Sequence, residues 1–258
     1  EKYAAAGIDD ASEPDWMLCE VLGVSRPELA QVPKLNKAQA ELLKKYVGER
    51  AEGRPLDYVT GKSYFLDYTL RVSDAVHLPR METETTALAA CDLIAARGYK
   101  TALDLMTGSG CIALALAKRT SARVTASDLS GEALAVARSN LPEGVETVRS
   151  DLFSDIPGAF DLIVSNPPYI RSGDIDGLQP EVKCQPRMSL DGGADGLDFY
   201  RAIAEQAPAH ITDGGALVLE IGHDQAAEVT ALLEPAFADI KVIKDMSGSD
   251  RVVTAVKK

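Results

Sequence analysis

The sequence predicts an α/β protein, with a doubly wound and largely parallel sheet that follows a small helical domain. From about residue 80 onward, short apolar runs alternate with segments of helical periodicity, the pattern of strand–helix–strand units. Before residue 53 the apolar side chains recur at helical spacing only. We therefore expect three parts, namely a helical domain over 1–52, a linker with a β-hairpin over 53–79, and an α/β domain over 80–258.

The predicted helical domain contains two clear amphipathic patterns. The first is followed by Gly23, a plausible helix C-cap, and its apolar positions are Trp16, Leu18, Val21 and Leu22. The second runs over 37–52. A domain of about 50 residues is marginal in isolation, so we expect it to pack against the chain that follows.

The linker has strand periodicity. Apolar or aromatic residues alternate with other residues, and Asp67 stands where a turn would fall; the alternating positions are Tyr64, Leu66, Tyr68, Leu70 and Val72. We expect a hairpin or an extended connection here.

The α/β domain begins with a helix over 83–97. The further predicted helices are 111–119, 131–140, 198–210 and 225–233, and the predicted strands are 101–106, 122–128, 145–150, 160–165, 214–222, 240–246 and 251–257. The last two strands are joined too briefly for a crossover helix, so we expect the final strand to be antiparallel.

Composition disfavours several classes of protein. The formal net charge is −12, and the basic residues are dispersed, so a broad phosphate-binding surface is not expected. No apolar run reaches the roughly 18 residues of a membrane span, and the first residues lack the pattern of a signal peptide. The four cysteines and three histidines are scattered without zinc-ligand spacing. We expect no metal, and reduced thiols in a cytoplasmic protein.

A glycine loop follows the first predicted strand. Gly108 and Gly110 lead from the strand that carries Asp104 into a helix, and such loops often approach nucleotides closely. Asp128 ends the second strand, where an acid typically binds ribose hydroxyls. The loop is neither the dinucleotide-binding fingerprint nor a P-loop.

The strand 160–165 is followed by Asn166-Pro167-Pro168-Tyr169. Proline fixes φ, lacks an N–H donor and restricts the preceding residue, so this stretch is stiff and cannot continue a strand. It presents an amide and an aromatic ring on a preorganised backbone. These groups favour a site for a flat, polar ligand.

Together these motifs resemble class I S-adenosylmethionine-dependent methyltransferases, and more narrowly the PrmC/HemK family. The resemblance covers nearly the whole chain, and its motifs are 104–110, Asp128, 166–169, 53–61, 79–84 and 185–197. It implies a Rossmann-like, seven-stranded domain that uses S-adenosylmethionine. The expected reaction is methylation of the side-chain amide nitrogen of the glutamine in the Gly-Gly-Gln motif of peptide chain release factors.

The resemblance also implies roles for individual residues. The expected cofactor-binding residues are Asp104, Met106, Thr107, Gly108, Ser109, Gly110, Asp128, Leu129, Asp151, Leu152 and Asn166. The expected substrate-binding residues are Asn166, Pro167, Pro168, Tyr169, Arg80 and Glu84, of which Asn166, Pro167 and Tyr169 are the catalytic candidates. Residues 1–52 would dock the release factor. We expect a cytoplasmic monomer that binds neither nucleic acid nor membrane.

An amide nitrogen is a poor nucleophile because its lone pair is shared with the carbonyl. The Asn166 side-chain oxygen and the Pro167 carbonyl could accept its two N–H groups, which would orient the nitrogen. His77 is expected to be structural rather than catalytic.

Two residues depart from the family pattern. Met106 replaces a glycine, and its side chain could crowd the loop or weaken cofactor binding; Met81 replaces a proline. Three alternatives stay open: an adenine N6-methyltransferase acting on DNA or RNA through the same motif, a ribosomal-protein glutamine methyltransferase, and a domain that binds the cofactor without catalysing transfer. The acidic charge argues against the first.

Overall fold

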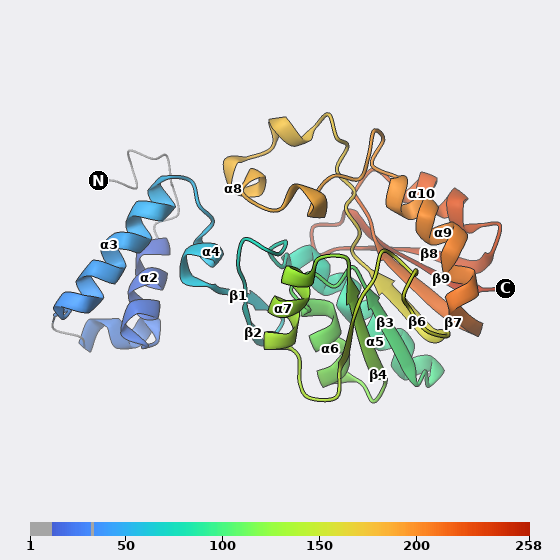
Figure 1. Cartoon of the computed structure of the whole chain (residues 1–258), viewed down its shortest axis with the longest axis horizontal. Coiled ribbons are helices and arrows are strands. Elements are labelled where there is room, and N and C mark those ends of the chain that lie inside the picture. The colour runs from blue at the N-terminus through green and yellow to red at the C-terminus, as the bar shows by residue number, and fades with distance from the viewer. Residues whose placement is uncertain (1–11, 32–33) are drawn as a thin grey trace. The chain divides into compact units, whose positions relative to one another are not determined.

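The computed structural model describes residues 12–31 and 34–258, which form two compact units. The smaller unit contains the described residues up to Lys62 together with Leu178–Cys184, and the larger contains Ser63–Gly177 and Gln185–Lys258 (Figure 1). Residues 1–11 and 32–33 of the predicted helical domain lie outside the described residues. A segment distant in the sequence thus joins the smaller unit, which the sequence alone did not indicate.

The smaller unit is helical. Its elements are α2 (Glu13–Leu22), the 3-10 helix η1 (Arg26–Gln31), α3 (Lys37–Ala51), α4 (Leu56–Thr60) and α8 (Pro180–Lys183). Gly23 ends α2 in the left-handed conformation, with φ 66°, as predicted. The prediction of an extended or hairpin chain at 56–60 was wrong, because these residues form a helical turn that Gly61 ends at φ 73°.

The centre of the smaller unit is ionic. Arg50, the buried residue of α3, donates from Nε and Nη2 to the Glu13 carboxylate at 2.8 and 3.0 Å, and from Nη2 to Glu181 at 2.5 Å. Two carboxylates around one guanidinium compensate its burial. Trp16, in contrast, is 45% exposed, so the predicted apolar positions of α2 do not all face its interior.

A two-stranded hairpin is formed by β1 (Lys62–Phe65) and β2 (Tyr68–Arg71). The predicted hairpin is therefore present, and Asp67 lies in its turn beside Leu66, which has φ 52°. The predicted alternation holds in β2, where Leu70 is buried. It fails in β1, where Phe65 is buried and Tyr64 is exposed, because the turn reverses which positions face inward.

The main sheet has seven strands in the order β5-β4-β3-β6-β7-β9-β8. They are β3 (Thr101–Leu105), β4 (Arg123–Asp128), β5 (Glu146–Arg149), β6 (Phe160–Ser165), β7 (Ile211–Glu220), β8 (Phe237–Lys244) and β9 (Asp250–Lys257). The first five run parallel, and β9 is antiparallel to both β7 and β8. The predicted antiparallel final strand is confirmed.

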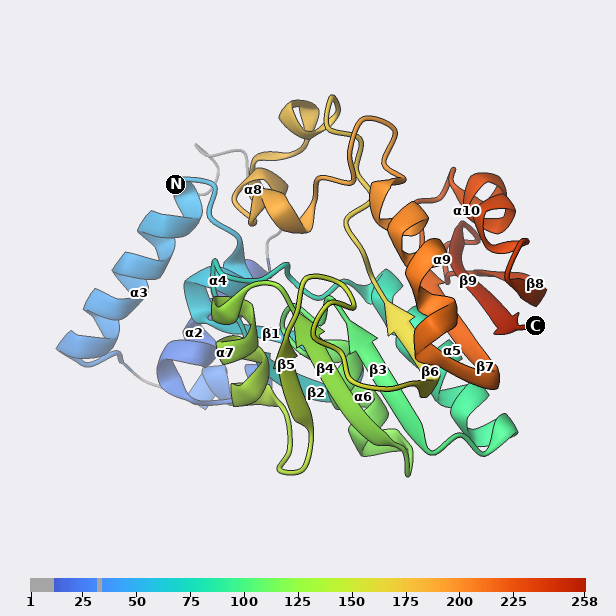
Figure 2. The same cartoon turned by 45° about the vertical axis from the view of Figure 1, so that its right-hand side comes forward.

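Helices cover both faces of this sheet (Figure 2). Helices α5 (Met81–Arg97), α6 (Cys111–Arg119) and α7 (Gly131–Asn140) contact one face, and α9 (Asp198–His210) and α10 (Ala226–Leu233) contact the other. Several strands are buried on both faces and therefore read as continuous apolar runs. Between β6 and α9 lie the short 3-10 helices η2 (Ile175–Gly177) and η3 (Arg187–Ser189).

The strand order places a topological switch point between β3 and β6. From β3 the chain moves outward to β4 and β5, and it then returns to β6 on the other side of β3. In open α/β sheets, ligands bind beyond the carboxyl ends of the strands at such a point. Here the segments that follow β3 and β6 are the glycine loop and Asn166–Tyr169.

Candidate active site

A pocket of about 280 Å³ opens at the switch point of the larger unit. It collects residues from the segments that follow β3, β4, β5 and β6 and from three further stretches. They are Ala75, Val76, His77, Met106, Gly108, Asp128, Leu129, Ser130, Ala133, Ser150, Asp151, Leu152, Asn166, Pro167, Pro168, Tyr169, Ile170, Pro186, Met188, Ser189, Leu190, Asp191 and Phe199. The pocket thus brings the glycine loop, the ends of β4 and β5 and the Pro-Pro segment into one cavity, mostly apolar with a few polar groups, as ligand sites usually are.

The glycine loop is held from below by a buried carboxylate. Asp104 Oδ2 accepts hydrogen bonds from the Thr107 hydroxyl at 2.5 Å and from the Ala113 N–H at 2.9 Å. Burial raises the pKa of Asp104 to about 7, and its Oδ1 has no hydrogen-bond partner among the described residues. Asp104 therefore shapes the loop rather than lining the pocket.

Gly108 and Gly110 favour glycine for different physical reasons. Gly108 has φ 55° and lines the pocket, and an added Cβ would meet nothing within 4 Å. Gly110 has φ 82°, and its added Cβ would lie 3.2 Å from the Cβ of Ala137 on α7. Gly108 thus leaves space for a ligand, whereas Gly110 permits close helix packing.

Met106 occupies the place where the resembled loops have a glycine, and the structure shows why glycine suits it. Its φ is 60°, a left-handed conformation that costs a residue with a side chain roughly 1–2 kcal/mol. The side chain packs against the hydrophobic core cluster of the larger unit and also lines the pocket. The strain is therefore offset in part by burial of the thioether.

Asp128 is fixed by two backbone donors. Its Oδ2 accepts from the Gly108 N–H and its Oδ1 from the Ser130 N–H, both at 2.9 Å. Burial raises the pKa of this carboxyl, and these hydrogen bonds oppose the rise. Each oxygen keeps a further lone pair for a ligand hydroxyl. Beside it lie the side chains of Leu129, which is 45% exposed, and of Leu152.

The segment after β6 is anchored at its first residue. The Asn166 Nδ2 donates to the Thr83 hydroxyl oxygen at 3.2 Å, and Pro167 and Pro168 are buried. Asn166 is half-buried and lines the pocket. The amide is therefore held by α5 and the backbone by two proline rings.

Two glycines anchor the other end of this segment. A Cβ on Gly192 would lie 2.7 Å from the Pro168 carbonyl oxygen, and one on Gly196 would lie 2.4 Å from that of Tyr169. Gln225 Nε2 donates to the Tyr169 and Gly196 carbonyl oxygens at 3.1 and 3.2 Å. Only glycine permits this approach, so the Gly-Gly-Ala-Asp-Gly stretch is the packing partner of the Pro-Pro segment.

Tyr169 remains a neutral phenol. Burial, with the nearby Glu220 carboxylate, raises the pKa of its hydroxyl to about 12. Its ring packs against the core cluster and lines the pocket. The side chain is therefore suited to packing rather than to proton transfer.

The predicted site residues divide into two sets. The pocket is lined by Met106, Gly108, Asp128, Leu129, Asp151, Leu152, Asn166, Pro167, Pro168 and Tyr169. The residues placed outside its lining are Asp104, Thr107, Ser109, Gly110, Arg80 and Glu84. The first four of these support the loop, and Glu84 instead accepts the Leu66 N–H at 2.6 Å, which ties the hairpin to α5.

Sequence reasoning missed one wall of the pocket. His77 lines it, and its Nδ1 is buried without a hydrogen-bond partner among the described residues. Burial, and then the Arg80 charge, lowers the pKa of His77 to about 4, so the ring is neutral at pH 7. Residues 186–191 supply the rest of this wall. The signal available was that residues 186–191 lie within the stretch 185–197, which carries the family resemblance.

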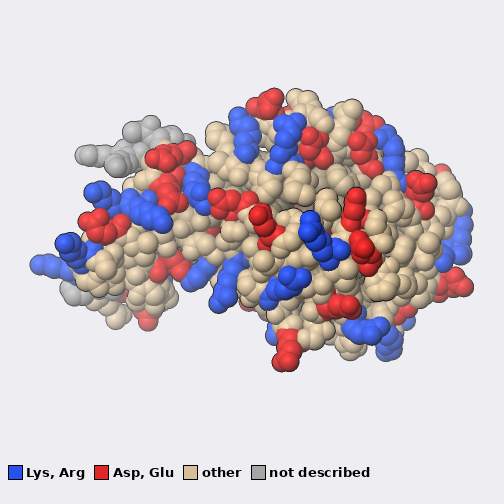
Figure 3. Space-filling model, viewed as in Figure 1, with Lys and Arg blue, Asp and Glu red and all other residues tan. Residues whose placement is uncertain are grey.

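Some classes of site find no support in the described part of the chain. Residues 12–31 and 34–258 contain no group of three metal-ligating side chains, and none of their helices has the length and apolar character needed to cross a bilayer. On the face drawn in Figure 3, acidic and basic side chains of the larger unit are intermixed.

Comparison with known proteins identifies both parts of the chain. Residues 67–179 match the family model "Methyltransferase small domain", and residues 4–61 match "PrmC N-terminal domain". Curated relatives named release factor glutamine methyltransferase are 40% identical in Cereibacter sphaeroides, covering 98% of this chain and 94% of theirs, and 40% identical in Chlorobaculum tepidum, covering 96% and 91%.

A solved methyltransferase structure from Pyrococcus furiosus shows the same fold. It has a TM-score of 0.52 and 20% identity, over 86% of this chain and 99% of that one. The larger unit therefore has the class I methyltransferase fold that the sequence predicted.

Proposed function

The chain belongs to the release factor glutamine methyltransferase family, and we propose that it transfers the methyl group of S-adenosylmethionine to the glutamine side-chain amide nitrogen in the Gly-Gly-Gln motif of peptide chain release factors. One observation carries this proposal. The rigid Asn166–Tyr169 segment and the cofactor-type loop around Gly108 and Asp128 line a single pocket.

The pocket fits the cofactor. Asp128 presents a fixed carboxylate for ribose hydroxyls, Gly108 leaves room for close backbone approach, and Met106, Leu129 and Leu152 supply apolar walls for the adenine ring. Asp151, exposed at the end of β5, is placed to accept from a polar edge. S-adenosylmethionine, when bound, supplies a methyl group on a sulfonium, which is electrophilic without further activation.

The acceptor side of the pocket recognises a primary amide. The Asn166 Nδ2 is committed to Thr83, so Asn166 Oδ1 accepts one N–H of the substrate amide and the Pro167 carbonyl oxygen accepts the other. Both acceptors belong to a segment stiffened by prolines and packed on Gly192 and Gly196, so little entropy is lost on binding. The Tyr169 ring packs on the flat amide.

These contacts address the weak nucleophilicity of the amide. Acceptors on both hydrogens stabilise the positive charge that develops on nitrogen as the carbon–nitrogen bond forms. The nitrogen would gain the methyl carbon as the carbon–sulfur bond of the sulfonium breaks and leaves a neutral thioether, and it would then lose one proton to the solvent, which leaves a neutral secondary amide. Alignment of the amide nitrogen with the methyl carbon supplies the remaining catalytic effect.

We further propose that residues 1–52 dock the release factor. We also propose that the protein is a cytoplasmic monomer that binds neither nucleic acid nor membrane. The match of residues 4–61 to the PrmC N-terminal domain supports a dedicated docking part. A second candidate, adenine N6-methylation, rests on the same Asn-Pro-Pro-Tyr motif. It would require base flipping and a basic channel, whereas the net charge is −12.

The test is methyl transfer from labelled S-adenosylmethionine to three acceptors: a purified bacterial release factor, the same factor with the Gly-Gly-Gln glutamine changed to glutamate, and a DNA duplex. The proposal expects label on the native factor only. Label on DNA, or equal label on both factors, would overturn it.

A further inference from the structure

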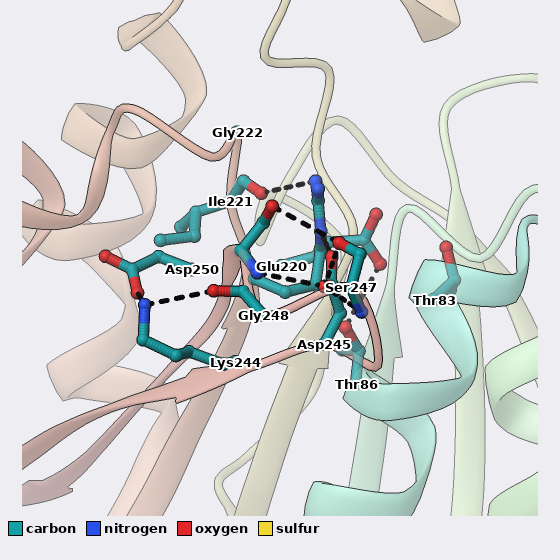
Figure 4. Close-up of polar contacts among 12 residues, drawn as sticks. Thr83, Thr86, Glu220, Ile221, Gly222, Lys244, Asp245, Ser247, Gly248 and Asp250 are labelled. Carbon is teal, nitrogen blue, oxygen red and sulfur yellow. Dashed lines mark hydrogen bonds and ion pairs between the residues drawn. The ribbon is translucent and has the colours of Figure 1, made fainter.

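Glu220 is a buried acid that the mechanism above leaves unused. It ends β7 and is 1% exposed. Figure 4 shows its carboxylate beside Thr83 and Thr86 of α5. A carboxylate that is removed from water in this way is costly unless it is hydrogen-bonded, so its partners indicate what it does.

Two threonines of α5 face this carboxylate. The Thr86 hydroxyl donates to Glu220 Oε2 at 3.0 Å. Thr83 lies one turn earlier on the same face of the helix, and its hydroxyl also favours the ionised form of Glu220.

The other groups around Glu220 are of both signs. The Arg251 charge favours ionisation and the Glu82 charge opposes it, while the neutral neighbours are Tyr169, Tyr200 and Cys111. Arg251 is engaged elsewhere as well, because its Nε donates to Asp245 at 3.1 Å and its Nη1 to the Ile221 carbonyl at 3.0 Å.

Thr83 also links Glu220 to the acceptor site. Its hydroxyl oxygen accepts the Asn166 Nδ2 at 3.2 Å. A threonine hydroxyl has a single proton. When the Thr83 hydroxyl donates its hydrogen bond to an ionised Glu220, the Thr83 oxygen can only accept from Asn166. The Asn166 amide must then present its nitrogen to Thr83.

We propose that Glu220 is a positioning residue, which acts through Thr83 to fix the orientation of the Asn166 amide and so directs Asn166 Oδ1 toward the acceptor amide. This inference rests on the proposed function of the pocket. It assigns a role to two residues, Thr83 and Glu220, that lie outside the pocket lining.

The direction of the hydrogen bonds from Asn166 through Thr83 to Glu220 depends on the charge of Glu220. A protonated Glu220 donates its own proton to Thr83, whose hydroxyl is then free to donate to Asn166 Oδ1 once the amide has flipped. Asn166 Oδ1 then accepts from Thr83 and is no longer directed toward the substrate amide. Burial raises the pKa of Glu220 to about 7, so the ionised fraction rises about tenfold between roughly pH 6 and pH 8.

The experiment measures kcat for methylation of the release factor against pH, at saturating cofactor, together with the KM for the factor and the cofactor Kd. Saturation is needed because Asp104, beneath the cofactor loop, also has a pKa of about 7. The variants are Glu220→Gln, Thr83→Val and Thr83→Ser. The matched control is Thr212→Val, which removes a hydroxyl that donates to Asp161 at 2.9 Å at the opposite end of β7.

We expect wild-type kcat to rise about tenfold across that pH range. Glu220→Gln and Thr83→Val should lose this rise and lower kcat at the alkaline end by about tenfold, the effect of one hydrogen bond. The KM and the cofactor Kd should change less than about twofold. Thr83→Ser and Thr212→Val should behave as wild type, since both leave a hydroxyl between Glu220 and Asn166.

The outcomes separate this inference from the proposed function. An inactive wild type that binds cofactor would overturn the proposed function. An active wild type whose pH profile survives in Glu220→Gln and Thr83→Val would overturn only the role of Glu220. The same would follow if Thr83→Ser failed as completely as Thr83→Val while all variants bound cofactor normally, because volume rather than the hydroxyl would then be decisive.

Discussion

The two loops that meet at the switch point are held in different ways. The glycine loop rests on an acid of its own strand, since Asp104 bonds directly to Thr107, and it includes a strained residue, Met106, at φ 60°. The Asn166–Tyr169 segment is stiffened by prolines, packed on distant glycines, and tied to α5 through Thr83.

This difference matches what the proposed function requires of each loop. A loop that wraps closely around a cofactor requires glycine and left-handed backbone. A segment that holds two acceptor oxygens at a fixed separation requires a backbone with few alternatives. The first loop is shaped by local hydrogen bonds, and the second by contacts from residues far away in the sequence.

The largest effect is expected from Asn166→Ala, which removes the side-chain acceptor but leaves the proline backbone. We expect kcat to fall by about a hundredfold or more, comparable to the loss of one transition-state hydrogen bond in other enzymes. Cofactor Kd, measured by calorimetry, should stay within about threefold. Near-normal turnover would show that Asn166 does not serve the acceptor side.

Gly196→Ala tests the packing that holds this segment. Its Cβ would lie 2.4 Å from the Tyr169 carbonyl oxygen, and its φ is 78°, so overpacking and backbone strain combine to about 3 kcal/mol of lost stability. Gly98→Ala is the matched control, with φ 70° and nothing within 4 Å, and should cost only about 1 kcal/mol. Equal losses in denaturant unfolding would contradict the packing argument.

The two buried acids predict an unusual dependence of stability on pH. Burial raises the pKa of Asp104 from 3.8 and of Glu220 from 4.5 to about 7. The folded state then binds protons more tightly than the unfolded state, so stability is greatest at low pH within this window and falls as pH rises toward 7.

We expect each acid to contribute on the order of 2 kcal/mol to this fall. Urea unfolding at about pH 5 and about pH 8 measures it, and Glu220→Gln should remove the share that Glu220 contributes. Surface acids such as Asp195, whose pKa the Arg201 hydrogen bond lowers to about 2, titrate below the window. Burial lowers the pKa of His77 from 6.5 to about 4, so His77 acts in the opposite direction and offsets about one acid's share, which leaves a net fall. A wild type that is more stable at the higher pH would refute the prediction.

The smallest effect concerns the strain at Met106. Met106→Ala removes the packed side chain and keeps the left-handed strain, whereas Met106→Gly removes both. The glycine variant should therefore be more stable than the alanine variant by about 1 kcal/mol, the reverse of their order inside a helix. If thermal unfolding showed the alanine variant to be more stable than the glycine variant, position 106 would be unstrained.

Much of the larger unit could be predicted from local sequence. The strands and helices around the glycine loop lie within a few residues of their predicted bounds, as for 111–119 and α6, because period and caps are local signals. The Asn166–Tyr169 segment was also apparent, because proline restricts its own backbone wherever it stands.

The rest depends on contacts that sequence spacing does not reveal. Glu220 follows Thr86 by more than a hundred residues and meets it only when β7 lies beside α5. Gly192 and Gly196 could be recognised as part of a motif. The sequence did not show that they are glycines because the backbone carbonyls of Pro168 and Tyr169 pack against them. The helix α4 was missed because its five residues, 56–60, are too few to show a period.

The central claim is that the pocket methylates a glutamine amide. Fragmentation mass spectrometry of a release factor incubated with the enzyme and S-adenosylmethionine tests it most directly, because the fragments locate the methyl group. The account predicts one methyl group, on the side-chain nitrogen of the Gly-Gly-Gln glutamine, in the wild-type reaction, and an initial rate of its formation lower by about a hundredfold or more with Asn166→Ala. A methyl group on another residue of the factor, or an undiminished rate with Asn166→Ala, would contradict the account.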